Sequence, residues 1–73
     1  MFLKEIVMQI TLNGDRTEAA EGSTIASLLL QLGIGRERVA VERNGDIVPK
    51  VAYEQQVLTE GDTIEIVHFV GGG

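Results

Sequence analysis

One short amphipathic segment constrains the fold of this chain more than any other feature of its sequence. Four apolar residues recur at i, i+3, i+4 and i+7, namely Ile25, Leu28, Leu29 and Leu32. This spacing places them on one face of a helix of roughly nine or ten residues, which Ser23 or Thr24 would cap and Gly33 would end. With 73 residues the chain is one small domain, and a domain near this size buries only about 60% of its unfolded surface. The stripe must therefore pack on a sheet built by the rest of the chain.

The rest of the chain carries the signals of strands and tight turns. The predicted strands, which alternate apolar and polar residues or are rich in β-branched ones, cover residues 8–12, 16–21, 39–43, 46–48 and 63–70. Turns are expected at Asn13-Gly14, at Asn44-Gly45 and at Glu60-Gly61-Asp62. Pro49 ends regular pairing, and the segment 51–58 should be irregular or a single helical turn.

The order of these elements predicts an α+β fold. Two strands, a helix, two strands, a connection and a final strand describe the β-grasp arrangement, a mixed sheet of four to five strands packed on one main helix. We expect a single domain over residues 1–73, with residues 1–7 as a possible N-terminal extension and residues 71–73 as a flexible glycine tail.

Composition excludes several classes of function. Eleven acidic and six basic residues give a net charge of −5, which repels nucleic acid and favours a partner with a basic surface. The absence of cysteine excludes disulfides and thiolate sites and fits a reducing compartment. The first residues fail as a signal peptide, and no apolar run approaches a membrane span. We expect a cytoplasmic protein that is a monomer when free and binds neither nucleic acid nor a membrane.

Three glycines, Gly71, Gly72 and Gly73, end the chain directly after the last predicted strand. They remove every Cβ, so the tail could enter a channel too narrow for a side chain and deliver only its α-carboxylate. Three extended residues span about 10 Å, enough to reach from a domain surface into another protein's active site. From the glycines alone, a frayed terminus or a linker remnant remains an equal alternative.

Three longer stretches carry a resemblance to a known family. They are MQITLNG (8–14), VAVERNGDIVPK (39–50) and EGDTIEIVHFVGGG (60–73). Together they resemble the sulfur-carrier proteins of thiamine biosynthesis, a ubiquitin-like β-grasp family. The resemblance runs from Met8 to the end, so residues 1–7 depart from the pattern.

The resemblance implies a carrier whose end is modified by other enzymes. Gly73 would be adenylated by a ubiquitin-activating-type (E1-like) adenylyltransferase that uses ATP and magnesium. A persulfide donor would then convert it to a thiocarboxylate, 1-thioglycine, which thiazole synthase would use as its sulfur source. Val70, Gly71 and Gly72 would form the tail that enters the partner's channel. The chain itself would bind no cofactor and no metal, and it would not be an enzyme.

Strand alternation adds a candidate docking surface. If Ile64 and Ile66 face the helix, then Val67 and Phe69 face away from it beside the tail. Exposed apolar groups of this kind often mark interfaces, although residues 1–7 or a loop could cover them. His68 is the only histidine, and without a second ligand at metal spacing we interpret it as structural.

Other residues are expected to have structural or solvated positions. Tyr53 is predicted to anchor a loop on the core. The scattered basic side chains Arg36, Arg38, Arg43 and Lys50 are predicted to form a solvated face, although one of them could pair with an acidic partner.

Three other functions stay open. The small subunit of molybdopterin synthase uses the same tail chemistry, a ubiquitin-like modifier would end joined to a lysine amine, and a plain interaction module would need no glycines. Catalysis by the isolated chain is not expected, because neither a paired acid and base nor an activated nucleophile appears in the sequence.

Overall fold

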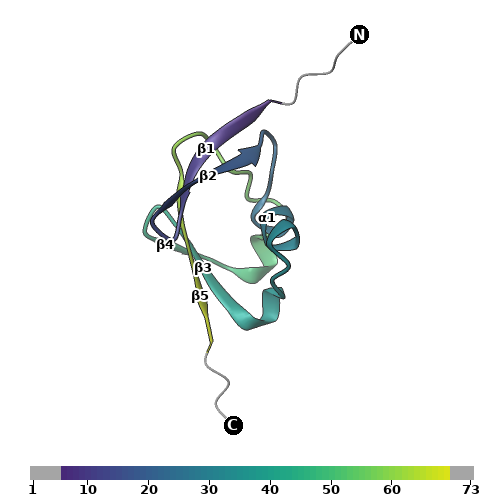
Figure 1. Cartoon of the computed structure of the whole chain (residues 1–73). Helices are drawn as coiled ribbons and strands as arrows, with labels where there is room; N and C mark the ends of the chain where they lie inside the picture. Colours follow the sequence, from purple (N-terminus) through teal and green to yellow (C-terminus); the bar gives the residue numbers. More distant parts are fainter. Residues whose placement is uncertain (1–5, 70–73) are drawn as a thin grey trace.

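A computed structural model describes residues 6–69, which form a five-stranded sheet packed against one helix (Figure 1). The strands are β1 (Val7–Leu12), β2 (Asp15–Ala20), β3 (Val39–Arg43), β4 (Asp46–Val48) and β5 (Thr63–His68). The helix is α1 (Ile25–Leu32), and two 3₁₀ turns follow it, η1 (Arg36–Arg38) and η2 (Lys50–Ala52). Across the sheet the order is β2-β1-β5-β3-β4. The central pair β1 and β5 is parallel, and the other neighbours are antiparallel. This arrangement confirms the predicted β-grasp fold.

The two hairpins form where the Asn-Gly pairs predict them. Asn13 and Asn44 have φ values of 48° and 52°, and the glycines after them have φ values of 87° and 89°. Two successive positive φ angles suit the twist of a two-residue hairpin, and asparagine tolerates the first of them better than most residues. These turns set the registers of β1 with β2 and of β3 with β4.

Helix α1 begins and ends at capped residues. Thr24 is the N-cap, since its hydroxyl accepts a hydrogen bond from the Ser27 amide at 3.1 Å. Gly33 ends the helix with φ 71°, and its amide donates to the carbonyls of the last turn. The helix has 8 residues, shorter than expected, and Leu32 is 41% exposed. The prediction that Leu32 belongs to the buried stripe is wrong, because α1 ends there, about one turn beyond the last buried residue.

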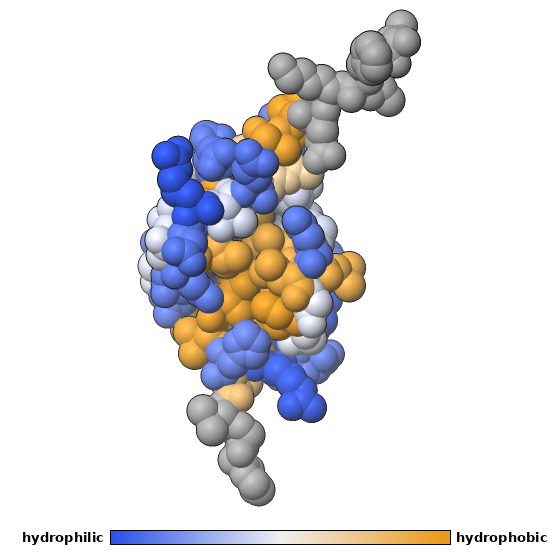
Figure 2. Space-filling model, viewed as in Figure 1, coloured by the Kyte–Doolittle hydropathy of each residue, from blue (hydrophilic) through white to orange (hydrophobic). Residues whose placement is uncertain are grey.

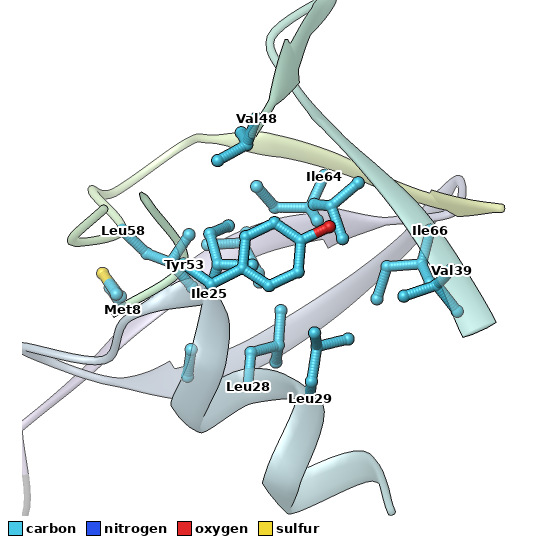
Figure 3. Packing of buried hydrophobic residues seen from close by; sticks show 13 residues of the cluster. Met8, Ile25, Leu28, Leu29, Val39, Val48, Tyr53, Leu58, Ile64 and Ile66 are labelled. Atoms are coloured by element: carbon cyan, nitrogen blue, oxygen red, sulfur yellow. The ribbon is translucent and has the colours of Figure 1, made fainter. Parts of the chain in front are cut away.

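The core lies between α1 and the inner face of the sheet (Figure 3). Ile25, Leu28 and Leu29 of the helix face Ile64 and Ile66 of β5 in this cluster. Figure 2 shows hydrophobic surface between the sheet and α1, where the core reaches the outside. Within residues 6–69, no helix is long and apolar enough to cross a membrane.

Tyr53 packs in the middle of the core and is only 1% exposed, as predicted for a loop anchor. Its carbonyl accepts the Ala26 amide at 3.0 Å, so the connection after η2 is held against α1 by the main chain as well as by the ring. Burial raises the pKa of Tyr53, because the interior disfavours the phenolate.

Candidate functional site

Strand β5 separates a buried face from an exposed one. Ile64 and Ile66 are buried against the helix side, whereas Val67 and Phe69 are 53% and 56% exposed. The predicted exposure of this pair is confirmed, and neither the described loops nor Ile6 and Val7 bury it. The expected tail and modified group, Val70, Gly71, Gly72 and Gly73, lie outside the described residues.

Two contacts involve Phe69, the last described residue. The Phe69 amide donates to the Arg38 carbonyl at 2.9 Å, which extends the pairing of β5 with β3 by one residue. The Lys50 ammonium lies 5.4 Å from the centroid of the Phe69 ring, within the range of a cation–π contact. Lys50 is exposed, as predicted, and its ammonium group adds this contact with the last described side chain.

A polar network fixes the beginning of β5. Asp62 is 5% exposed and accepts hydrogen bonds from Arg43 Nε at 2.9 Å, Asn44 Nδ2 at 3.0 Å and the Thr59 amide at 2.8 Å. Arg43 also donates to Gln56 at 2.8 Å. The prediction that Arg43 lies on a solvated face is therefore wrong, because its guanidinium bridges the β3–β4 hairpin to the turn before β5.

The charge state of Asp62 follows from the same contacts. Burial by itself would raise the pKa of Asp62, but the hydrogen bonds from Asn44 and Thr59, together with the positive charge of Arg43, outweigh it. The net effect holds the pKa of Asp62 below its usual value. The network therefore contains an ionised carboxylate at neutral pH, which strengthens each bond that it accepts.

The side chain of Asn13 continues the sheet where β1 stops. The main-chain amide of Asn13 donates to the Ile64 carbonyl at 2.9 Å. Its side-chain Oδ1 accepts the Ile66 amide at 2.7 Å, and its Nδ2 lies 3.4 Å from the Ile66 carbonyl. The asparagine was predicted only from turn geometry, and the sequence gives no signal for this second role.

The exposed face of the sheet carries acidic and apolar groups beside each other. Glu42 of β3 lies directly opposite Glu65 of β5 and, on its other side, opposite Ile47 of β4, which is 70% exposed. Among residues 6–69 the ion pairs are Arg36–Glu54 and Arg43–Asp62, so neither Glu42 nor Glu65 takes part in one. This face would suit a partner with apolar and basic groups.

A hollow of about 420 Å³ lies beside α1 and is lined mainly by apolar atoms of Ala26, Leu29, Leu30 and Ile34. Arg36 closes one side, paired with Glu54 and stacked 5.2 Å from the centroid of the Tyr53 ring. In the described part of the chain, no group of three or more histidine, cysteine or acidic side chains could hold a metal ion. His68 is exposed at the end of β5 and has no such cluster around it.

Comparisons with known proteins agree with this geometry. The model of the ThiS family matches residues 7–73. The sulfur carrier protein ThiS of Bacillus subtilis is 43% identical over 65 residues, covering 88% of this chain and 98% of that protein. A crystal structure of the thiamine biosynthesis protein ThiS from Geobacter metallireducens superimposes with a TM-score of 0.78 at 33% identity. That match covers 90% of this chain and all of the other.

A longer protein is also similar. A thiazole synthase of Magnetococcus marinus is 50% identical over 66 residues, which are 90% of this chain and 20% of that protein. This chain thus spans about a fifth of the length of that relative. The matched family model, the full-length carriers and the shared fold lead to one conclusion: the chain belongs to the ThiS family, the sulfur carrier proteins of thiamine biosynthesis.

Proposed function

We propose that the chain carries sulfur as a thiocarboxylate on Gly73 and delivers it to thiazole synthase. The observation that carries the proposal is the exposed pair Val67 and Phe69 at the end of β5, which Val70 and three glycines follow in the sequence. A partner that binds Val67 and Phe69 would therefore also have the C-terminal tail of the carrier close to its surface. Membership of a sulfur-carrier family supports the nature of the cargo.

The chemistry begins at a group that cannot react without activation. A free α-carboxyl has a pKa of about 3.3–3.7, so Gly73 ends as a carboxylate, which is a poor electrophile. An E1-like adenylyltransferase would join it to the AMP part of magnesium-bound ATP and release pyrophosphate. The terminal sulfur of a persulfide donor would then attack the acyl carbon and displace AMP. A thiol would cleave the resulting acyl disulfide, leaving the thiocarboxylate and a new disulfide on the donor.

The choice of thiazole synthase as the acceptor rests on the longer relative. In the Magnetococcus thiazole synthase, a segment similar to this chain belongs to the same polypeptide as the rest of that protein. Such linkage is expected for two parts that act on each other. For this chain, the similarity supports thiazole synthase as the protein that receives the sulfur.

The proposal is tested by the intact mass of the carrier. The full chain is incubated with ATP, magnesium, an E1-like enzyme of the thiamine type, and a persulfide source. A mass gain that corresponds to exchange of one oxygen for sulfur at Gly73 is expected, and it should be absent from a chain trimmed of Gly72 and Gly73. An unchanged mass, when the same enzyme charges the Bacillus subtilis carrier, would refute the proposal. Thiol-resistant adducts to lysine would indicate a protein modifier instead.

The absence of side chains in the tail is tested separately. Gly72→Ala and Gly73→Ala should each sharply reduce adenylation, because the added methyl group would meet the wall of the partner's channel. Ordering the tail costs about 1–2 kcal/mol per residue in backbone entropy, and only a closely fitting channel would make enough contacts to offset this cost. The rate of pyrophosphate release measures the step. Normal rates for both variants would contradict the steric reasoning.

A further inference from the structure

The edge of β5 that faces β1 is open at its C-terminal end. On its opposite edge, β5 forms main-chain hydrogen bonds with the β3 side through its odd-numbered residues. For example, the Phe69 amide donates to the Arg38 carbonyl, and the Thr63 carbonyl accepts the Asn44 amide. In an antiparallel pair the hydrogen-bonded positions alternate, so the main-chain groups of Ile64, Ile66 and His68 point away from β3 and toward the side of β1.

The first two of these three positions have partners. The Ile64 carbonyl accepts the Asn13 amide, and the Ile66 amide and carbonyl meet the Asn13 side chain. At Asn13 the chain turns into β2, so β1 does not reach the level of His68. Within residues 6–69, the main chain of His68 is therefore the first on this edge with neither a strand nor a side chain opposite it.

We infer that the open edge of β5 at His68 is a strand-addition site, where an extended segment of thiazole synthase pairs with the main chain. The inference rests on the proposed function and adds the mode of recognition. Four residues, 70–73, continue from this edge to the carboxyl group that the partner must receive. Val67 and Phe69 would contact the same partner from the exposed face.

Two substitutions at one position separate the main chain from the side chain. His68→Pro removes the amide hydrogen, and an outward-facing amide on an open edge is where a strand tolerates proline. His68→Ala is the matched control, because it removes the imidazole and keeps the amide. Binding of the full-length, uncharged carrier to thiazole synthase is measured by calorimetry. We expect proline to weaken it about three- to tenfold, the usual contribution of one main-chain hydrogen bond, and alanine to leave it unchanged.

Hydrogen exchange supplies an independent measurement on the unmodified chain. The His68 amide should exchange fast in the free carrier and become protected in the complex, whereas the Ile66 amide is protected in both. Equal affinity of wild type and His68→Pro, or an equal loss for the proline and alanine variants, would overturn the inference. If the proline variant does not fold, an unprotected His68 amide in the wild-type complex would overturn it. Formation of the thiocarboxylate is a separate reaction, so its presence or absence tests the proposed function alone.

Discussion

The contribution of Phe69 to docking can be worked out from its exposure. Phenylalanine presents about 200 Å² of surface, and 56% of Phe69 is exposed. A partner that covers the ring would therefore bury about 110 Å², worth about 2.8 kcal/mol at 25 cal/mol per Å². Alanine keeps the β-carbon, so Phe69→Ala should lose about 2 kcal/mol, or roughly 30-fold in Kd.

The assay is calorimetric titration of thiazole synthase with each full-length carrier. Phe69→Ala also loses the contact with Lys50 and the buried part of the ring, so urea unfolding must show that the variant is folded under the binding conditions. Leu30→Ala is the matched control, because Leu30 is 80% exposed and lies on α1 instead of the exposed sheet face. An unchanged Kd for Phe69→Ala, or an equal loss for Leu30→Ala, would refute the assignment of this face.

Three further predictions concern the residues that position β5. Asp62→Ala should lower the free energy of unfolding by about 3–5 kcal/mol, because it leaves a half-buried Arg43 without its counter-charge, and Asp62→Asn should lower it by less. Chemical denaturation measures both losses. A loss below about 1 kcal/mol for Asp62→Ala would contradict the role of the network. Folding lowers the pKa of Asp62, so ionised Asp62 stabilises the fold above the unfolded pKa of 3.8, and this stabilisation is lost as the pH falls through the lower folded pKa. Wild type should therefore lose more stability than Asp62→Asn on acidification. Parallel pH profiles of stability for the two proteins would speak against this. Asn13→Ala should lower the free energy of unfolding by about 2 kcal/mol, because it removes two hydrogen bonds to Ile66 and places alanine at a positive φ. It should also make the Ile66 amide hydrogen exchange faster. Hydrogen-exchange protection of Ile66 equal to wild type would disprove the pairing.

Local patterns predicted most of the architecture, because the elements of this fold have strong periodic signals. The helical spacing around Leu28 located α1, and the two Asn-Gly pairs located both hairpins. The exposure of Val67 and Phe69 followed from alternation along a strand whose other face had to meet the helix. These inferences need only neighbours within a few positions of the chain.

The contacts around β5 could not be predicted in this way, because they join residues far apart in sequence. Arg43 and Asp62 are 19 positions apart, and Asn13 and Ile66 are 53 positions apart. Nothing in the composition of either segment distinguishes a bridging arginine from a solvated one. The position of Lys50 over Phe69 depends likewise on how η2 packs, which the irregular sequence of that connection does not determine.

The parallel pairing of β1 with β5 has a practical consequence. Because both strands run in the same direction through the middle of the sheet, the start of β1 and the end of β5 lie at opposite ends of the domain (Figure 1). An affinity tag or surface attachment placed before β1 would leave the proposed docking residues Val67 and Phe69 accessible. A protein anchored in that way would leave the end of β5 exposed, so that binding of the proposed partners could be measured on a chip.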